Sequence, residues 1–249
     1  MAEDRGQDGL LFSIVMPAYN EEAVIGKTLR DLSDHLEAEG FRYEILAVDD
    51  GSADRTGEIV TALAAERPAI RLVRNPGPGG YGFAIRRGLD VYRGDAVVIV
   101  TADGADAPKD VAAYFRAIEA GHDCAFGSRF SGGAKVSGYP PLKLVMNRLA
   151  NAFLSLVLRR RYDDFTNGFK CYRREVIEAM RPFVAGQFNI TIELAAKAIL
   201  GGWRYVVIPN DWTEREAGTS NFRVLRLIKP YFMTLIYCLS EDYLKKVRR

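Results

Sequence analysis

The sequence has few of the side chains that build disulfide frameworks or metal clusters. Its 249 residues include three cysteines, Cys124, Cys171 and Cys238, which lie far apart and never as Cys-x-x-Cys. This spacing argues against a zinc ribbon or a disulfide framework, and buried free thiols in a reducing compartment are expected. The only histidines, His35 and His122, lie in no pattern typical of a catalytic base or a metal ligand.

Strong net charge and long apolar runs are also absent. The formal net charge is +2, so no overall field selects nucleic acid, and we expect no nucleic-acid partner. No uninterrupted apolar run approaches the ~18 residues of a spanning helix. The polar, acidic start of the chain lacks the basic residues and apolar core of a signal peptide. We therefore expect a cytoplasmic protein that is peripherally associated with the inner face of the membrane.

Strand-like and helical patterns alternate through the first half of the chain. The helical face formed by Ile25, Leu29, Leu32 and Leu36 is an example, with Asn20 as its expected N-cap. The strand-like runs are 10–17, 43–50, 70–75, 95–103 and 122–128. Because these runs are apolar on both faces, they predict an α/β fold with a mostly parallel sheet covered by helices on both sides.

The alternation weakens after residue 135. We expect helices over 140–160 and 189–202, a loop over 163–172 and a late strand over 203–209. In parallel sheets, ligands bind beyond the carboxyl ends of the strands. This rule selects the strand-end segments 17–21, 49–52, 75–82, 101–106 and 127–129.

The glycine run at 77–82, GPGGYG, has two interpretations. It matches G-x-G-x-x-G between a strand and a helix, with Asp103 about twenty residues on, which is the form of a dinucleotide-binding fingerprint. Two complete strand–helix units precede it, however, and Pro78 stiffens the loop. The alternative is a tight turn in which glycines let the backbone approach a nucleotide, with Arg86 on the next helix facing phosphate.

Eight segments in order resemble the family 2 glycosyltransferases, and most of all the polyprenol- and dolichol-phosphate sugar synthases. They are SIVMPAYNEE, ILAVDDGSADRT, RNPGPGGYGFAIRRG, the strand-end Asp103, GSRFSGG, DFTNGFKCYRREV, IELAAKA and REAGTSN, which together cover residues 12 to 222. The resemblance implies a GT-A fold, a nucleotide-diphosphate sugar donor, an inverting mechanism and a lipid-phosphate acceptor. It also implies a catalytic domain over 1–222, followed by a C-terminal segment over 223–249.

The resemblance assigns the first strand ends to the donor nucleotide. Two adjacent carboxylates at the end of a buried strand, Asp49 and Asp50, need partners, and a base amino group and ribose hydroxyls would supply them. The expected nucleotide-binding residues are Pro17, Tyr19, Glu21, Asp49, Asp50, Gly79, Arg86 and Asp103. The residues do not select between GDP-mannose and a UDP-sugar.

Asp103 is the expected ligand of a divalent metal, Mg²⁺ or Mn²⁺, which neutralises the leaving diphosphate. The family pattern is Asp-x-Asp followed by a polar residue two positions on, whereas this chain has Thr101, Asp103 and Ala105. Asp106 is a candidate second ligand, direct or through water. Its alternative role is to cap the helix that follows Pro108. We therefore expect a rebuilt and weaker metal site.

Three arginines from distant segments are expected to hold the acceptor phosphate. They are Arg129, Arg148 and Arg215, and their forked guanidinium groups suit phosphate oxygens. Ser128 and Ser220 would assist, while Asn221 stands where many relatives have lysine. The alternative for the arginines is a place in surface salt bridges. Asp103, Arg129 and Arg215 are the expected catalytic residues.

The class of acceptor decides whether a general base is needed. A phosphate monoester has a second pKa of ~6 and arrives largely as a dianion, so positioning and charge stabilisation suffice. A saccharide hydroxyl would need a base, and Asp163 or Asp164 is the candidate. A third possibility is a non-catalytic protein that binds a nucleotide sugar. Oligomeric state has no signature in the sequence.

The C-terminal stretch 222–249 carries two signals for a membrane surface. Arg223, Arg226 and Lys229 are three apart, and a short, largely apolar stretch interrupted by Pro230 follows them. Such a segment suits one helix or a helix pair lying in the membrane interface, with the basic residues near anionic headgroups. The alternative is a helix packed on the domain with a solvated basic end.

Overall fold

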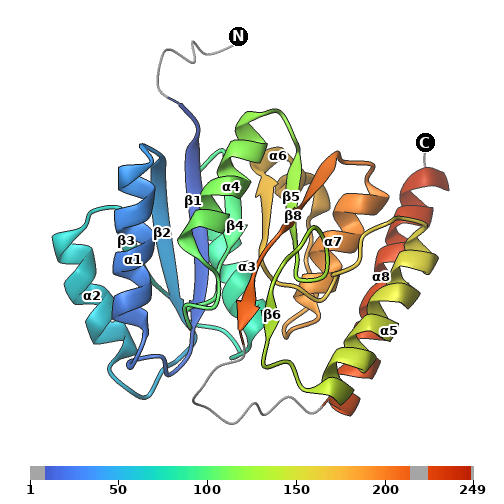
Figure 1. Cartoon of the computed structure of the whole chain (residues 1–249), viewed down its shortest axis with the longest axis horizontal. Helices are drawn as coiled ribbons and strands as arrows, with labels where there is room; N and C mark the ends of the chain where they lie inside the picture. The colour runs from blue at the N-terminus through green and yellow to red at the C-terminus, as the bar shows by residue number, and fades with distance from the viewer. Residues whose placement is uncertain (1–8, 214–223, 248–249) are drawn as a thin grey trace.

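The computed structural model describes residues 9–213 and 224–247. In this part of the chain, a central sheet of seven strands lies between two layers of helices (Figure 1). The strand order is β3-β2-β1-β4-β7-β5-β8. The strands are β1 (Leu11–Ala18), β2 (Arg42–Asp49), β3 (Ile70–Arg74), β4 (Ala96–Ile99), β5 (Cys124–Ser128), β7 (Lys170–Arg173) and β8 (Tyr205–Pro209).

Each face of the sheet has its own hydrophobic core because side chains alternate along every strand. Phe12, Ile14 and Met16 of β1 point to one core, and Val15 points to the other. The first core packs under α1 (Ile25–Ala38), α2 (Thr56–Glu66) and α4 (Pro108–Glu119). The second packs under α3 (Tyr81–Val91), α5 (Pro141–Leu158), α6 (Arg174–Met180), α7 (Ile190–Leu200) and α8 (Val224–Val247).

The predicted strands and helices are present, with shifted ends. The fourth strand stops at Ile99, four residues before the predicted end, so residues 100–106 are free to form a loop. The predicted apolar face of α1 is buried. Asn20 does not cap that helix, as we had expected. It lies five residues before the first helical residue with a positive φ of 54°, and Val24 is the N-cap.

The predicted loop over 163–172 is wrong at its end, where Lys170–Arg173 forms β7. This strand runs antiparallel between β4 and β5, pairing Val98 with Cys171 and Ala125 with Cys171. The pattern hid it because only four residues are in the strand. As a result, the segment that precedes β7 lies at the same edge of the sheet as the carboxyl ends of β4 and β5.

Two smaller features complete the fold. β6 (Val136–Ser137) and β9 (Trp212–Thr213) form a short parallel pair outside the main sheet. α8 is one helix of 24 residues that continues through Pro230. Leu235 and Cys238 on its inner face are buried in the same core as α7, so α8 packs on the domain.

Among the described residues, one helix is long and apolar enough to cross a membrane by these two criteria alone. It is α5, Pro141–Leu158, and only 17% of it is buried. We expected no such segment from the uninterrupted runs, because Lys143, Asn147 and Arg148 interrupt the sequence. Asn147 and Arg148 bond to the domain through Thr166 and Asp163, so the polar side of the helix lies on the protein.

Candidate active site

The loops after β1 and β2 are tied to each other at the carboxyl edge of the sheet. The backbone N–H of Asn20 donates to Ser52 Oγ at 3.0 Å, and the N–H of Ala53 donates to Asn20 Oδ1 at 2.8 Å. Glu21 N donates to Thr56 Oγ1 at 2.9 Å. Of the predicted base-binding residues in this region, Pro17 is buried, Glu21 is partly exposed and Tyr19 is 59% exposed.

The adjacent carboxylates Asp49 and Asp50 have partners within the protein. Asp49 Oδ1 accepts the N–H of Ser52 at 2.9 Å. Asp50 accepts from the side chain of Asn75 and from the N–H of Gly80, both at 2.6 Å. Asp50 therefore anchors the glycine-rich loop beside the β2 end. A nucleotide contact by either carboxylate stays a prediction.

Two glycines of the 77–82 loop are required by another part of the protein. A Cβ on Gly82 would lie 2.7 Å from the carbonyl oxygens of Ala185 and Gln187, and one on Gly80 would collide with Gly186 and Gln187. The tight-turn interpretation thus accounts for Gly80 and Gly82. Gly77 and Gly79 are exposed.

Arg86 lies against the same neighbouring segment. Its guanidinium donates to Val184 O at 3.5 Å, and its Cζ lies 5.5 Å from the centre of the Phe83 ring. A phosphate contact by Arg86 stays a prediction.

Thr101 holds the two candidate metal ligands together. Its hydroxyl lies 2.6 Å from Asp103 Oδ1 and 2.9 Å from Asp106 Oδ2, while its N–H donates to Asp106 Oδ2 at 2.8 Å. The N–H of Ala105 donates to Asp103 Oδ1 at 3.0 Å. A threonine in place of the first carboxylate therefore positions the two that follow it. Asp106 makes no cap hydrogen bond to α4, whose N-cap is Ala107.

The electrostatics of this pair fit a bound cation. The pKa of Asp106 is raised to about 7, mainly by burial and also by the negative charge of Asp103, although hydrogen bonds from Thr101 and the charge of Arg129 lower it. A divalent ion would relieve the repulsion between two close carboxylates. Within residues 9–213 and 224–247, no three His, Cys, Asp or Glu side chains are placed to hold a metal together. Two carboxylates suit an ion that takes its other ligands from water and phosphate.

The pair opens onto a cavity. Asp103 and Asp106 line a space of about 220 Å³ together with Thr28 and Asp31 of α1. On another side lies Tyr81. Burial raises its pKa above the ordinary value, and the charges of Asp106 and Asp103 raise it further. Tyr81 was not predicted as a site residue, because an aromatic residue inside a glycine run has no distinctive pattern.

Arg129 forms a buried ion pair with Asp164. Its Nε and Nη2 donate to the two carboxylate oxygens at 2.8 and 2.7 Å, and its backbone N–H donates at 3.0 Å. Asp164 is 0% exposed. Arg129 Nη2 also donates to Thr166 Oγ1 at 3.2 Å. This geometry disfavours Asp164 as a general base, because both of its carboxylate oxygens already accept hydrogen bonds from Arg129.

Ser128 and Arg148 lie on either side of this pair. Ser128 Oγ donates to Asp163 Oδ1 at 2.6 Å, and Arg148 Nη1 lies 3.8 Å from Asp163 Oδ2. The guanidinium groups of Arg129 and Arg148 are 5.4 and 4.5 Å from the Phe130 ring centre. The structure therefore brings Ser128, Arg129 and Arg148 together. Arg215 and Ser220 lie outside the described residues.

Lys170 is a buried cation that the sequence did not single out. It is 1% exposed, and its ammonium donates to the carbonyls of Phe165 and Asn167. Burial lowers its pKa to about 7. Its ammonium group therefore holds the backbone of the 163–169 loop. Its signal was missed because the residue was assigned to a loop.

Comparisons with known proteins agree on one family. The family model described as "Glycosyl transferase family 2" matches residues 13–181. The chain is 32% identical over 213 residues to polyprenol monophosphomannose synthase of Mycolicibacterium smegmatis, covering 83% of this chain and 79% of that protein. It is 30% identical over 213 residues to dolichol-phosphate mannosyltransferase of Pyrococcus furiosus, covering 85% of this chain but only 59% of the relative.

A solved structure supports the same fold. Glucosyl-3-phosphoglycerate synthase from Mycobacterium tuberculosis, in complex with Mn²⁺, uridine diphosphate and glucosyl-3-phosphoglycerate, superimposes with a TM-score of 0.70 at 19% identity. The match covers 92% of this chain and 80% of that one. The GT-A fold expected from the motifs is therefore confirmed, and the dinucleotide-binding interpretation of the glycines is wrong.

Removing the Asp103 carboxylate should reduce turnover by about 10²–10³, the scale for losing one principal charge contact in the transition state. Asp106→Asn should cost less and raise the metal concentration needed for half-maximal rate. Steady-state rates across a Mn²⁺ titration measure both effects. Asp34→Asn, on the surface beside Arg67, is the control and should behave as wild type. Near-full activity of Asp103→Asn would place the metal site elsewhere.

The raised pKa of Asp106 predicts a pH-dependent stability in the presence of a chelator. The folded protein binds this proton with a pKa of about 7, whereas the unfolded chain binds it near ~4. The free energy of unfolding should therefore fall as pH rises from ~4 to ~7, by at most ~1.4 kcal/mol per pH unit from this group. Urea unfolding of wild type and Asp106→Asn isolates the effect. A wild-type profile parallel to that of the variant would contradict it.

Proposed function

The chain belongs to glycosyl transferase family 2, and on that premise we propose that it transfers a sugar from a nucleotide-diphosphate donor to a polyprenol phosphate. The printed names of the relatives, a polyprenol monophosphomannose synthase and a dolichol-phosphate mannosyltransferase, support this acceptor class. The donor is GDP-mannose or a UDP-sugar. The resulting product is a lipid-linked monosaccharide phosphate.

One structural observation carries the proposal: the paired carboxylates and the arginines lie in one place. Asp103 and Asp106 follow β4, and Arg129 follows β5, two strands that share β7 as their neighbour. Arg129 is close enough for its positive charge to lower the pKa of Asp106. A donor diphosphate beside the carboxylates and an acceptor phosphate beside Arg129 and Arg148 would therefore be neighbours. This is the proximity that a group transfer requires.

The chemistry needs no strong base from the protein. An oxygen of the acceptor phosphate, already deprotonated, forms the new bond to the anomeric carbon as the bond to the nucleotide diphosphate breaks. The leaving electron pair stays on the diphosphate. Arg148 holds the incoming phosphate, and Arg129, fixed by Asp164, presents its remaining edge to the same anion.

A divalent ion held by Asp103 and Asp106 would supply charge neutralisation for the leaving diphosphate. The structural neighbour crystallised with Mn²⁺ and uridine diphosphate supports this class of cofactor. Thr101 holds the two carboxylates near each other, because its hydroxyl contacts both of them. A saccharide hydroxyl as acceptor is less well supported, because Asp164 is paired with Arg129 and Asp163 accepts from Ser128.

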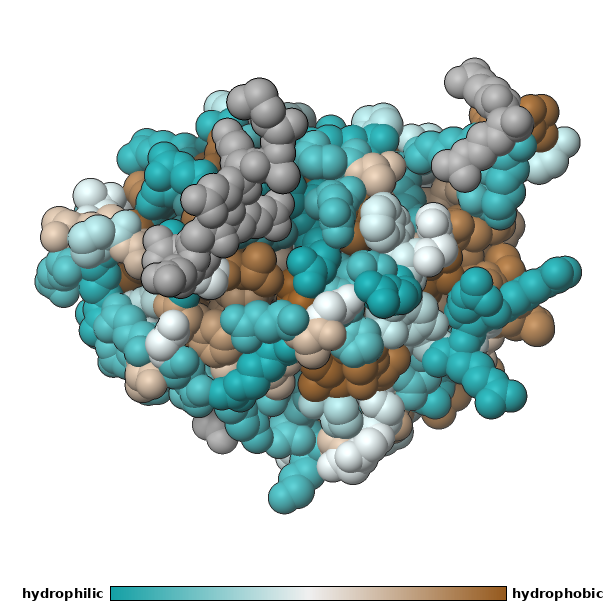
Figure 2. Space-filling model, turned by 90° about the horizontal axis from the view of Figure 1, so that it is seen from above, coloured by the Kyte–Doolittle hydropathy of each residue, from teal (hydrophilic) through white to brown (hydrophobic). Residues whose placement is uncertain are grey.

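The exposed apolar residues of α5 and α8 support a membrane surface as partner. On α5, Leu149 is 62% and Leu156 76% exposed, and they fall on one helical face. That face consists of Leu142, Val145, Leu149, Phe153 and Leu156. Figure 2 shows apolar surface at the end of the molecule where α5 and α8 lie, between hydrophilic side chains. Both helices pack on the same core, so we propose that they lie together in the interface.

The sequence predicted membrane attachment through the C-terminal segment alone. We now propose that α5 takes part together with α8. Phe232, Met233 and Ile236 of α8 are exposed, while Leu235 and Cys238 face the domain. One side of the helix thus holds it on the protein, and the other is apolar and open. The side chains of Arg223 and Arg226 lie outside the described residues, whereas Lys229 is exposed.

A screen of nucleotide sugars against a polyprenol phosphate tests the function. GDP-mannose, UDP-glucose and UDP-glucuronate are each incubated with the protein and radiolabel transfer to lipid is measured, with Mn²⁺ or with chelator. We expect one donor to label the lipid and the chelator to abolish the labelling. Binding of a nucleotide sugar without any transfer would instead support the non-catalytic alternative.

Polar substitutions on α5 should weaken binding to vesicles. Leu149→Gln combined with Phe153→Gln removes apolar surface, so sedimentation with anionic vesicles should fall severalfold while nucleotide binding is unchanged. Ala62→Gln combined with Ala65→Gln, at two exposed positions of α2, is the control and should sediment as wild type. Wild-type binding should weaken with salt without vanishing, because only its electrostatic part is screened. Undiminished sedimentation of the α5 variant would exclude this helix from the interface.

A further inference from the structure

Residues 181–189, here called the clamp segment, contact the glycine-rich loop, residues 77–82, and the start of α3. The N–H of Phe83 donates to Gly186 O at 3.2 Å, and the side-chain amide of Gln187 donates to Gly79 O at 3.3 Å. The rings of Tyr81 and Phe188 stack with centres 4.6 Å apart. The clamp segment therefore packs directly against the glycine-rich loop.

A buried carboxylate holds the clamp segment in place. Glu193 of α7 is 0% exposed and accepts the N–H groups of Val184 and Ala185, with distances of 2.8 to 3.1 Å. Lys197, one turn further along α7, lies 3.3 Å from Glu193 and donates to the carbonyls of Met180 and Pro182. The first half of the clamp segment is thus fixed by two charged groups of α7.

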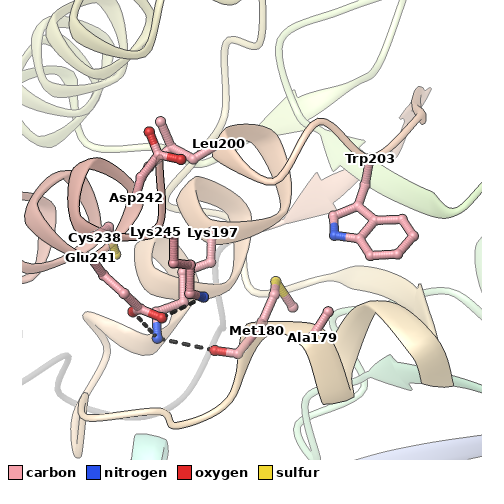
Figure 3. Close-up of a pocket in the computed structure, with 9 residues that line it drawn as sticks. All are labelled: Ala179, Met180, Lys197, Leu200, Trp203, Cys238, Glu241, Asp242 and Lys245. Atoms are coloured by element: carbon pink, nitrogen blue, oxygen red, sulfur yellow. Dashed lines mark hydrogen bonds and ion pairs between the residues drawn. The ribbon is translucent and has the colours of Figure 1, made fainter. Parts of the chain in front are cut away.

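α8 joins this network at two points. Glu241 lies 2.8 Å from the ammonium of Lys197, at the rim of a small pocket that Met180, Trp203 and Cys238 also line (Figure 3). One side of Lys197 thus faces α8 and the other faces the backbone of the clamp segment. The ion pair is largely buried, with Lys197 5% and Glu241 17% exposed, so water weakens it little.

The second point is a short chain of hydrogen bonds. Asn189 Nδ2 donates to Thr234 Oγ1 of α8 at 2.8 Å, and Asn189 Oδ1 accepts the N–H of Gln187 at 3.2 Å. Gln187 in turn donates to Gly79 O. Thr234 and Asn189 are both buried. Three side chains therefore connect the inner face of α8 to the backbone of the glycine-rich loop.

We infer that Gln187, Asn189 and Thr234 are positioning residues for the glycine-rich loop, and that they make donor-nucleotide binding depend on how α8 is seated. Glu241 and Lys197 form the second connection. The outer face of α8 is apolar and exposed. A membrane surface that binds this face would therefore stabilise the glycine-rich loop through the contacts of the inner face of α8. By linkage, the dependence is reciprocal. The inference rests on the proposed nucleotide site at this loop.

Hydrogen exchange of the ligand-free full-length protein tests the connection without any nucleotide. Thr234→Val and Glu241→Gln should each raise amide exchange in peptides covering residues 77–83 and 184–188. Asp242→Asn, which removes the i, i+4 pairing to the exposed Lys246 within α8, is the matched control and should exchange as wild type. Thr234→Ser keeps the hydroxyl and should restore protection. Wild-type exchange of 77–83 in both Thr234→Val and Glu241→Gln would overturn the inference.

Calorimetry with GDP and UDP in the presence of Mn²⁺ gives the functional readout. Thr234→Val and Glu241→Gln should weaken binding of the preferred nucleotide by about fivefold, the lower end for coupled sites, with Asp242→Asn unchanged. A lower melting temperature with unchanged nucleotide affinity would show a purely structural role and would also overturn the inference. If wild-type protein binds neither nucleotide, the proposed function fails, and the exchange result still decides whether α8 positions the loop.

Discussion

The active-site edge of this protein depends on the buried pair between Arg129 and Asp164. Arg129 follows β5 and Asp164 precedes β7, so the pair joins two strands that run in opposite directions. Two charges removed from water are stable only when they are paired and hydrogen-bonded, and breaking such a pair typically costs about 3–5 kcal/mol. Asp164 receives three donors from Arg129 alone. This satisfied pair fixes the 163–169 loop beside the β4 end, where Asp103 lies, and leaves Arg148 and Ser128 at its margin.

The carboxylates after β4 show how one substitution changes a site without removing its chemistry. Thr101 stands where the family pattern has an acidic residue, yet its hydroxyl and N–H bond to both Asp103 and Asp106. A neutral donor between two acids lowers the charge that must be held together, and burial keeps the pKa of Asp106 at about 7. A cation arriving with a diphosphate would complete the balance. This arrangement is the reason for proposing that metal and donor bind here together.

The helices α5 and α8, at the edge of the domain, present an apolar surface on one side of the molecule. α5 and α8 share a core with α7, and they expose apolar residues on their outer faces. The inner face of α8 is bonded to Lys197 and Asn189, which also support the segment against the glycine-rich loop. Local elements of this kind have their own stability, so a surface that orders α8 also stabilises what α8 supports. The surface proposed to face lipid and the loop proposed to bind the nucleotide thus belong to one packed unit.

The sequence by itself determined the mostly parallel sheet, its early strands and the edge at which the candidate site residues lie. Continuous apolar runs buried on both faces, such as Leu11–Ala18, and the i, i+4, i+7 face of α1 are local patterns that burial enforces in any such fold. The motif series also identified the family, because family membership is a matter of sequence similarity and needs no structure. Tertiary structure alone decided that Lys170–Arg173 forms an inserted antiparallel strand, because four residues carry too short a pattern to be distinguished from a loop. It alone decided that Arg129 meets Asp164, that Asp50 binds the loop at Gly80, and that Gly82 makes room for Ala185. These contacts join residues 30 to 103 positions apart, and no local spacing encodes which distant partner a charge or a glycine will meet.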